Sequence, residues 1–360
     1  MRLLVATPLY PPEGGGPATY SKIIEEEFAR EGDEVALVKF SDFHKYPKYI
    51  RNIMYFFAVL DKAFSADIVL VLDPVSTGFP ALVAGRLAGK KVVVKVVGDY
   101  AWEQGVQKCA VKDSLDEFVR TKQVPALCGF FRFIQTTVAR LATRVIVPSD
   151  YLKGIVSLWG IKKSKIETIY NSIALPSALP QTSNATAPYI ITVARLVPWK
   201  GIDALIDVYG RVRAEFPQLS LVIVGDGPEK NKLMEKAVSA GGTVQLTGGL
   251  PHEDALALVQ GAKIFVLNST YEGLSHVLIE SLMLGTPVLA SDAGGNPETV
   301  IEGENGHIVP VGSQIALQEA LEKMLRSDTF DRAQIASKAQ EKFAVSKMIE
   351  KTRTLLQSLI

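Results

Sequence analysis

The sequence predicts an α/β protein with two Rossmann-like domains, each built around a doubly wound parallel sheet. Three observations lead to this fold class. Short apolar runs rich in β-branched residues alternate with segments of helical period. Those runs are apolar at nearly every position, as in strands that a parallel sheet buries on both faces. A length of 360 residues suits about two domains of ~150 residues each.

The first predicted domain covers residues 1–173. It opens with a strand at Leu3–Ala6. Ala18–Arg30 follows with one apolar helical face and is closed by Gly32. Further strands are predicted at Glu34–Val38, Ile68–Leu72, Val92–Val97 and Arg144–Val147.

Residues 174–188 interrupt this alternation. They contain three prolines and many small polar residues, which predicts a linker. The second predicted domain covers residues 189–340, and residues 341–360 are predicted as a C-terminal helix. The strands of the second domain are expected at Tyr189–Val193, Leu219–Val224, Val244–Leu246, Ile264–Leu267 and Val288–Ala290.

The composition excludes several classes of protein. Apolar residues make up 48% and charged residues 21% of the chain, which does not fit a disordered protein. No run of 18 or more apolar residues is present, so we expect no membrane-spanning helix. Cys109 and Cys128 lack the spacing of a zinc site, and the chain is predicted to be cytoplasmic.

The net charge of +1 hides an asymmetry along the chain. Residues 1–172 carry 23 Lys and Arg against 18 Asp and Glu, a balance of +5, whereas the remainder has a balance of −4. The first domain is therefore the one suited to an anionic partner. No nucleic-acid partner is predicted.

A glycine-rich segment, Pro11–Pro17, follows the first strand. In open α/β sheets, ligands bind beyond the carboxyl ends of the strands. Gly14, Gly15 and Gly16 would let the backbone approach a ligand, and the next helix would direct its positive end to the same place. The two interpretations of this segment are a phosphate or sugar contact and a plain surface loop.

Two cations lie on the loop after the first strand of the second domain. Arg195 and Lys200 are five residues apart at the carboxyl edge of the predicted sheet. Such a pair can neutralise a diphosphate, with the arginine capable of bidentate contact. Either residue alone would suggest a solvated charge, but their shared position favours a site.

Two glutamates frame the start of a later helix. Glu272 follows a buried strand, Gly273 and Leu274 lead to Ser275 as N-cap, and Glu280 lies more than one turn inside the helix. Backbone N–H groups at Gly273, Leu274 and Ser275 would face an anion. A carboxylate beside an anion site is explained if it binds the hydroxyls of a sugar or ribose.

Two other chemistries are not indicated. Leu221–Lys230 begins like a dinucleotide fingerprint, but Lys230 occupies the third glycine position and Gln245 stands where an acid is required. This argues against NAD. No Asp-x-Asp occurs in the chain, so a metal-dependent diphosphate site is not predicted, and cations with a helix end would balance the leaving-group charge.

In combination, the motifs of this sequence resemble the family-four glycosyltransferases of the GT-B type, which are retaining enzymes that use nucleotide sugars. The matching features are Glu272 and Glu280 as an E-x7-E motif with Gly273, Leu274 and Ser275, Arg195 and Lys200 as an R-x4-K pair, the glycines at 14–16, and Gly294–Glu298 as a GGxPE segment.

This resemblance implies a hexosyltransferase in polysaccharide or glycolipid biosynthesis. A UDP- or GDP-linked sugar would bind the second domain and a hydroxyl acceptor the first, across a cleft, with no metal or other cofactor. Arg195 and Lys200 would hold the diphosphate, Glu272 the transferred sugar and Glu280 the ribose. The last helix would cross back to the first domain.

The sequence departs from the family at two places. Many relatives have a histidine after the fourth strand, where Val96–Trp102 here contains Asp99. Asp99 is interpreted either as an acceptor base or sugar contact, or as a helix cap. The frequent Asn-Gly-Val-Asp at the domain junction is here Asn171 to Ala174, so contacts from the missing acid are lost.

Two further functions share this architecture. One is a sugar-nucleotide epimerase, and the other is a non-catalytic protein that binds a nucleotide sugar or a partner. Intact Arg195, Lys200, Glu272 and Glu280 argue against a degenerate member. The base, the sugar and the acceptor are not indicated by the sequence.

Residues 44–60 combine basic and aromatic side chains. If the segment is helical from about Tyr49, then Tyr49, Ile53, Phe56 and Phe57 share one face. One interpretation is peripheral contact with an anionic membrane, where the enzyme would meet a lipid-linked acceptor. The other is a helix whose apolar face packs on the sheet. The basic residues of the segment are Lys45, Lys48 and Arg51.

Overall fold

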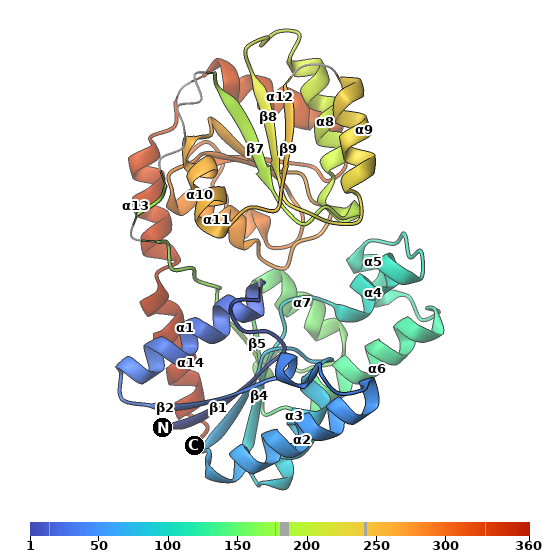
Figure 1. Cartoon of the computed structure of the whole chain (residues 1–360), viewed down its shortest axis with the longest axis vertical. Coiled ribbons are helices and arrows are strands. Elements are labelled where there is room, and N and C mark those ends of the chain that lie inside the picture. The colour runs from blue at the N-terminus through green and yellow to red at the C-terminus, as the bar shows by residue number, and fades with distance from the viewer. Residues whose placement is uncertain (14, 177, 181–186, 241–242, 328) are drawn as a thin grey trace. The chain divides into compact units, whose positions relative to one another are not determined.

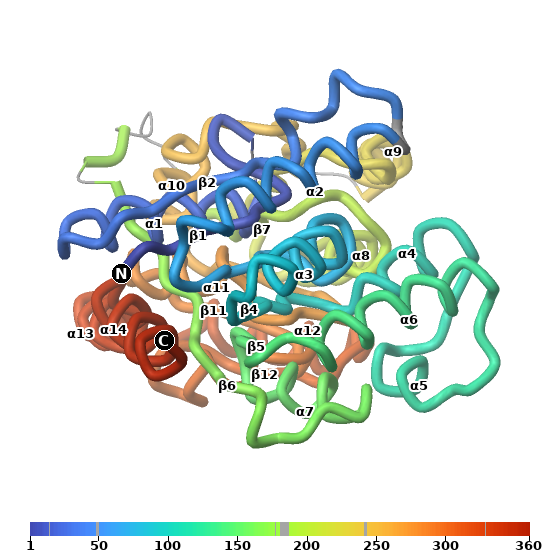
Figure 2. The backbone as a smooth tube through the Cα atoms, turned by 90° about the horizontal axis from the view of Figure 1, so that it is seen from below, coloured from blue at the N-terminus to red at the C-terminus, as the bar shows by residue number. Residues whose placement is uncertain are grey.

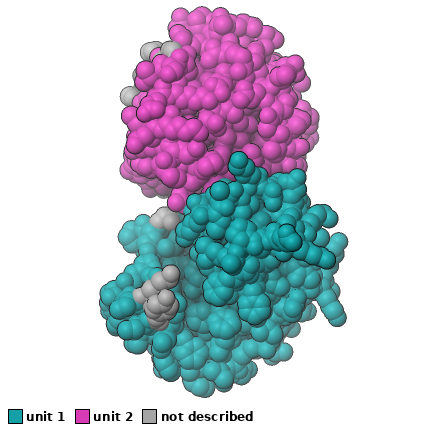
Figure 3. All heavy atoms as spheres, turned by 90° about the vertical axis from the view of Figure 1, so that its right-hand side faces the viewer, with its two compact units in different colours: residues 1–172, 345–360 teal, residues 173–344 magenta. Residues whose placement is uncertain are grey.

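Two parallel sheets organise the chain, which confirms the predicted fold class. The computed structural model describes residues 1–13, 15–176, 178–180, 187–240, 243–327 and 329–360, without the side chains of residues 48 and 49. Unit 1 comprises residues 1–172 and 345–360, and unit 2 comprises residues 173–344 (Figure 3). Much of the predicted linker 174–188 lies outside the described residues.

Unit 1 contains, within the described residues, a six-stranded sheet in the order β2-β1-β3-β4-β5-β6. All neighbouring strands are parallel, and the strand order reverses between β1 and β3. Ligands bind at such a switch point in open α/β sheets. The strands are β1 Arg2–Thr7, β2 Glu34–Lys39, β3 Ile68–Val71, β4 Lys91–Lys95, β5 Arg144–Val147 and β6 Ile166–Thr168.

Helices cover both faces of this sheet. Figures 1 and 2 show α1 and α14 on one face and α2, α3 and α6 on the other. The helices of unit 1 are α1 Gly16–Arg30, α2 Lys48–Ser65, α3 Gly78–Leu87, α4 Tyr100–Lys108, α5 Leu115–Arg120, α6 Ala126–Leu141, α7 Asp150–Leu158 and α14 Val345–Gln357.

The core under α1 contains side chains from both ends of the chain. Ile349 and Leu356 of α14 are buried in the same cluster as Tyr20 and Phe28 of α1. The hydroxyls of Tyr20 and Thr352 lie 3.5 Å apart. Helix α14 is therefore an integral part of unit 1, although unit 2 separates it from the rest of unit 1 in the sequence.

One lysine is buried in unit 1. The side chain of Lys95, the last residue of β4, is 2% exposed, and its Nζ has no hydrogen-bond partner in the described residues. Nζ lies 4.0 Å from the ring centre of Tyr20, within reach of a cation–π interaction. Burial disfavours the charged amine and lowers the pKa of Lys95 to about 7.

Unit 2 contains, within the described residues, a second six-stranded parallel sheet in the order β12-β11-β10-β7-β8-β9. The strand order reverses between β7 and β10, which follows the 3-2-1-4-5-6 pattern of dinucleotide-binding folds. The strands are β7 Tyr189–Val193, β8 Ser220–Val224, β9 Val244–Gly248, β10 Ile264–Leu267, β11 Val288–Ser291 and β12 Gly306–Val309.

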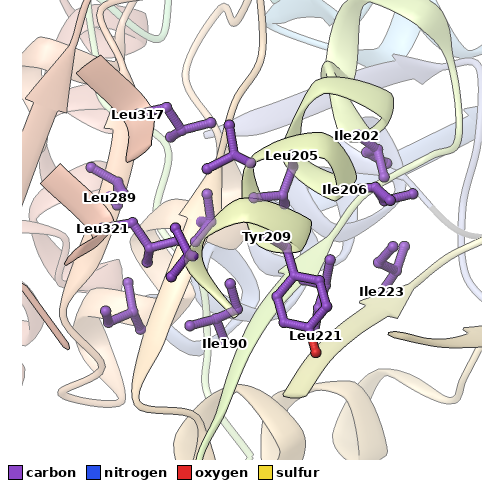
Figure 4. Close-up of a cluster of buried hydrophobic side chains, with 14 of the residues drawn as sticks. Ile190, Ile202, Leu205, Ile206, Tyr209, Leu221, Ile223, Leu289, Leu317 and Leu321 are labelled. Carbon is purple, nitrogen blue, oxygen red and sulfur yellow. The ribbon is translucent and has the colours of Figure 1, made fainter. Parts of the chain in front are cut away.

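Packing against α8 and α12 forms the main core of unit 2. Figure 4 shows Leu205 and Tyr209 of α8 and Leu321 of α12 gathered over Ile190 of β7 and Leu289 of β11. The helices of unit 2 are α8 Ile202–Val212, α9 Lys230–Ala240, α10 His252–Gly261, α11 His276–Met283, α12 Gln314–Arg326 and α13 Arg332–Lys342.

Each sheet has one strand that the sequence does not predict. β6 has three residues and includes Glu167, and β12 includes Gly306 and His307. Such short, mixed segments lack the continuous β-branched run of a buried strand. The strand predicted at Val92–Val97 is also too long, since β4 ends at Lys95.

Helix α2 buries a face that differs from the predicted stripe. Tyr55 and Val59 are fully buried, whereas Ile53 and Phe57 are more than half exposed. The interpretation in which the predicted stripe packs on the sheet is therefore wrong for Ile53 and Phe57, because Tyr55 and Val59 occupy the buried positions instead. The side chains of Lys48 and Tyr49 lie outside the described part of the chain.

Among the residues described, no helix combines the length and apolarity that crossing a lipid bilayer requires.

Candidate functional site

The charged residues predicted for unit 2 lie at the switch point of its sheet. Arg195 and Lys200 follow β7, and Glu272 follows β10. Because β7 and β10 are neighbours in a parallel sheet, their carboxyl ends open onto the same edge. The strand order therefore brings together two segments that lie far apart in sequence.

Backbone contacts fix the two loops against each other. The N–H of Thr270 donates to the carbonyl of Trp199 at 2.7 Å, and the side-chain amide of Asn268 donates to the carbonyl of Gly201 at 2.9 Å. Gly201 has a φ of 58°, and a Cβ there would lie 2.2 Å from the Asn268 carbonyl oxygen. Only glycine permits this approach, which holds the adjacent Lys200 over the β10 loop.

Lys200 and Glu272 form an ion pair in this loop contact. The ammonium Nζ of Lys200 lies 2.5 Å from Oε1 of Glu272, and both side chains are largely buried. The hydroxyl of Ser269 donates to the same Oε1 at 2.6 Å. Within the described residues, Oε2 of Glu272 has no hydrogen bond, so that oxygen can accept one from a ligand hydroxyl.

The second glutamate has a histidine partner. Glu280, in α11, is buried, and its Oε1 lies 2.8 Å from Nε2 of His252 at the start of α10. The carboxylate raises the pKa of His252 through this hydrogen bond, against the opposing effect of partial burial. Oε2 of Glu280 also has no hydrogen bond among the described residues.

Helix α11 begins where the sequence predicts. Ser275 is its N-cap, and the Ser275 hydroxyl accepts from the N–H of Leu278 at 3.3 Å. Gly273 and Leu274 are buried in the turn between Glu272 and this cap. The backbone of the GGNPE segment supports the turn, since the N–H of Gly295 donates to the carbonyl of Glu272 at 3.1 Å.

Arg195 differs from Lys200 in its surroundings. It is exposed, and its guanidinium has no hydrogen bond or ion pair within the described residues. The guanidinium of Arg195 is therefore available to a ligand, on the same loop that carries Lys200. Such a fork-shaped donor set suits a phosphate group.

The glycines after β8 have a packing function. A Cβ at Gly225 would lie 1.9 Å from the carbonyl oxygen of Ala194. The segment that begins like a dinucleotide fingerprint therefore uses Gly225 to admit the backbone of the neighbouring β7 loop.

In unit 1, the glycine-rich segment leads into α1 at the switch point of the first sheet. Gly15 is the N-cap of α1 and Gly16 is its first residue, and no side chain caps this end. Tyr10 and Glu13 close the preceding turn through two hydrogen bonds, of 3.1 and 3.2 Å. Gly14 lies outside the described residues.

Asp99 is buried and caps α4. Its Oδ1 accepts from the N–H of Trp102 at 2.9 Å, and its Oδ2 accepts from the indole N–H of Trp159 at 3.1 Å. The carboxyl is 1% exposed, and burial raises its pKa. These contacts favour the interpretation of Asp99 as a helix cap over that of an acceptor base.

Sequence reasoning identifies the two glutamates but misses the residues that hold them. Ser269 lies just after β10, and His252 follows Pro251 directly at the start of α10. A histidine at the start of a helix that follows a strand end is a usable signal. In the part of the chain that is described, no group of three or more His, Cys, Asp or Glu side chains could hold a metal ion.

Comparison with known families accounts for almost the whole chain. Residues 2–172 match the family described as glycosyl transferase 4-like domain, and residues 180–342 match glycosyl transferases group 1. The chain is built from two glycosyltransferase domains.

Several curated proteins are similar to these two glycosyltransferase domains. The Vi polysaccharide biosynthesis protein VipC/TviE of Salmonella typhi is 30% identical over 56% of this chain and 37% of its own length. The phosphatidyl-myo-inositol mannosyltransferase of Mycobacterium leprae is 29% identical over 47% of this chain and 48% of its own. The matches thus span about half or less of these relatives.

Solved structures share the fold. HepE of Anabaena, in complex with UDP and glucose, has a TM-score of 0.77 at 19% identity, with full coverage of both chains. A sucrose-phosphate synthase from Thermosynechococcus elongatus has a TM-score of 0.76 at 19% identity, covering 99% of this chain and 98% of its own. These neighbours are GT-B glycosyltransferases, and the likeness establishes the GT-B architecture.

Proposed function

We propose that this protein is a retaining, metal-independent glycosyltransferase of family four. It would transfer a hexose from a UDP- or GDP-linked sugar to a hydroxyl of a glycan or glycolipid. The observation that carries the proposal is the Lys200–Glu272 pair of 2.5 Å at the switch point of the second sheet, with the exposed Arg195 on the same loop. Relatives named for polysaccharide and phosphatidylinositol glycosylation support the substrate class.

The roles of the cations follow from the charge that develops in the reaction. When the bond between the sugar C1 and the phosphate oxygen breaks, negative charge grows on the diphosphate. Arg195 and Lys200 would stabilise this charge, and positioned charges in a poorly hydrated site act strongly on a transition state. Gly273, Leu274 and Ser275 at the positive end of α11 would contribute in the same sense.

The two glutamates would bind hydroxyl groups. Oε2 of Glu272, close to Lys200, would accept from the transferred sugar, and Oε2 of Glu280 would accept from the ribose. The acceptor hydroxyl would attack C1 on the face that the phosphate leaves. Its proton would pass to the departing phosphate oxygen, so the enzyme needs no nucleophile of its own. In unit 1, Gly15 and Gly16 would let the backbone contact a phosphate or a sugar.

A thermal-shift panel tests the donor assignment. Nucleoside diphosphates of uracil, guanine and adenine, each with and without its sugar, should give stabilisation with one base. NMR of the product formed with a matching acceptor should then show the anomeric configuration of the donor. Absence of any shift across the panel would overturn the proposal.

The same assay separates the alternatives. An epimerase would convert the nucleotide sugar to an isomer without an acceptor, and a binding protein would give a shift without turnover. Metal independence predicts that EDTA leaves the rate largely unchanged. A strict requirement for magnesium or manganese would mean that the diphosphate is not neutralised by Arg195 and Lys200 alone.

A further inference from the structure

The outer face of unit 1 is apolar over three adjacent helices. α2, α3 and α6 cover one side of the first sheet (Figures 1 and 2). Each of these helices has large apolar side chains that are exposed. We call this set the outer apolar face. Its members are Ile50, Ile53, Met54, Phe57 and Phe64 of α2, Phe79 and Leu87 of α3, and Leu127, Phe130, Phe133 and Leu141 of α6.

Helix α2 is apolar on both of its sides. Tyr55 and Val59 are fully buried against the unit, while Phe57 is 57% and Phe64 is 64% exposed. A helix on the surface of a soluble domain normally buries one apolar stripe and exposes a polar one. The exposed aromatic side chains are therefore not explained by the folding of unit 1 and mark an interaction surface.

A groove opens within the outer apolar face. It has a volume of about 510 Å³ and is lined by residues of α2, α3, α6 and the turn before α3. Only two of them, Asn52 and Ser76, are polar. Phe57 and Phe79 form part of its wall, and Ile134 of α6 contributes from the third helix. This lining suits a hydrocarbon chain and offers few hydrogen bonds to a sugar.

The same helices carry a net positive charge. The sequences of α2, α3 and α6 contain six lysines and arginines and only one acid, Asp61. That difference of five equals the whole positive balance of residues 1–172. The six cations are Lys48, Arg51, Lys62, Arg86, Arg132 and Arg140.

Cations also crowd together at one end of this surface. Arg86 donates to the carbonyl of Leu141, and Lys165 donates to the carbonyl of Arg140 at 2.5 Å. Neither Arg86, Arg140 nor Lys165 makes an ion pair within the described residues. Partial burial, followed by the charges of Arg86 and Arg144, lowers the pKa of Lys165. The exposed Leu141 is next to Arg140 in the chain.

We infer that the outer apolar face of unit 1 docks on an anionic lipid bilayer. Aromatic and aliphatic side chains would enter the boundary between headgroups and acyl chains, the basic residues would meet anionic headgroups, and the groove would receive one lipid chain. Charge complementarity selects this occupant, because three helices with a net positive charge and exposed phenylalanines fit an anionic membrane surface. The docking does not depend on the proposed glycosyl transfer.

Co-sedimentation of the full chain with vesicles tests the docking. Vesicles of phosphatidylcholine with phosphatidylglycerol should retain the protein at low salt, pure phosphatidylcholine vesicles should retain much less, and added salt should release it. Phe57→Asn with Phe133→Asn should reduce binding by about tenfold or more, and Lys62→Gln with Arg140→Gln should remove most of the preference for phosphatidylglycerol.

A matched control lies in unit 2. Ile315 is 74% exposed on α12, so Ile315→Asn removes a similarly exposed apolar side chain and should leave vesicle binding unchanged. All these positions are on the surface, and the thermal midpoints of the variants should stay close to that of the wild type. A Phe57→Trp variant should also show quenching of its fluorescence by vesicles containing brominated acyl chains.

Three outcomes would overturn the inference. They are wild-type protein that stays in the supernatant with phosphatidylglycerol vesicles at low salt, phenylalanine variants that bind as the wild type does, and fluorescence of the Phe57→Trp variant that brominated lipid does not quench. A dimer in light scattering that Phe57→Asn dissociates would assign the face to a second copy of the chain instead.

Discussion

The two units share an architecture but place their charged groups differently. In unit 2, the ends of β7 and β10 carry the Lys200–Glu272 pair, and Glu280 pairs with His252 nearby. In unit 1, the carboxylate after β4, Asp99, accepts hydrogen bonds from two tryptophans as a helix cap. The strand ends of unit 2 thus bring paired charged side chains together from separate segments, while the corresponding carboxylate of unit 1 stabilises its own fold.

The outer helices show the opposite contrast. Those of unit 2 carry ion pairs such as Lys236–Asp207 at 2.6 Å, whereas those of unit 1 expose phenylalanines such as Phe57 and Phe133. In a doubly wound fold, both the loops and the outward surfaces of the helices can vary while the fold stays the same. In this protein, unit 2 has specialised in its loops and unit 1 in its helix surface.

The largest expected effect tests whether the two units are separate in stability. Leu356 of α14 and Leu321 of α12 are both fully buried, one in each unit. Leu356→Ala and Leu321→Ala should each cost about 3 kcal/mol of unfolding free energy from lost burial and the cavity left behind. Hydrogen exchange followed by mass spectrometry should show faster exchange in unit 1 for the first variant and in unit 2 for the second. If either variant increased hydrogen exchange equally in both units, the units would not be separate in stability.

The second prediction concerns the two cations of unit 2 that are proposed to bind the diphosphate. Lys200→Ala or Arg195→Ala should weaken donor binding and slow turnover together, by about a hundredfold or ~3 kcal/mol of transition-state stabilisation. Lys236→Ala is the matched control, because it also removes an ion-paired lysine of unit 2, and it should leave both parameters nearly unchanged. Steady-state kinetics with the donor found in the panel decide this, and near-normal rates in both site variants would refute the assignment.

The third prediction separates the two glutamates. Glu280→Ala should mainly raise the KM for the donor, because a ribose contact is equally strong in the ground and transition states. Glu272→Ala should lower kcat more, since its contact lies near the reacting sugar and it also holds Lys200. The opposite pattern, with chemistry lost only in Glu280→Ala, would exchange their roles.

The smallest effect is a pH dependence confined to unit 1. The pKa of Lys95 is about 7 in the folded chain, below the ordinary lysine value of 10.5. Between these values the unfolded chain binds a proton that the folded chain does not, so this group makes stability rise with pH. Lys95→Met should therefore stabilise unit 1 most at or below about pH 7. Its advantage over the wild type should shrink as the pH rises above that value.

Thermal unfolding between about pH 6 and pH 9 measures this difference. Lys91→Met, at the exposed start of the same strand, should show no such trend. A constant difference between Lys95→Met and the wild type across the range would mean that the amine is charged throughout.

Most of the fold could be predicted from the sequence, because the strands are buried on both faces and therefore consist of continuous apolar runs. β7 and β10 have the predicted bounds, since every residue of Tyr189–Val193 and Ile264–Leu267 is apolar or β-branched. β6 and β12 were not predicted, because a three-residue edge strand with Glu167 and a strand with His307 give no such signal.

Only part of the candidate site could be predicted from the sequence. The sequence places Lys200 and Glu272 after strands, but their contact depends on β7 and β10 being neighbours, which is a property of strand order. The position of His252 at the start of a helix marks it as a candidate, but its contact with Glu280 depends on how α10 packs against α11. The orientation of α2 could not be predicted either, because its apolar residues lie at exposed positions such as Ile53 and Phe57 as well as at buried ones such as Tyr55 and Val59.

The position of α14 has a consequence for how the chain folds during synthesis. Residues 1–172 leave the ribosome before all of unit 2, and the helix that contributes Ile349 and Leu356 to their core emerges only after residue 344. Unit 2 is continuous in sequence and can complete its core while unit 1 still lacks a helix. Although it comes second in the chain, unit 2 is therefore the first of the two that can reach its final structure, and the nascent unit 1 must keep an uncovered apolar sheet face in the meantime.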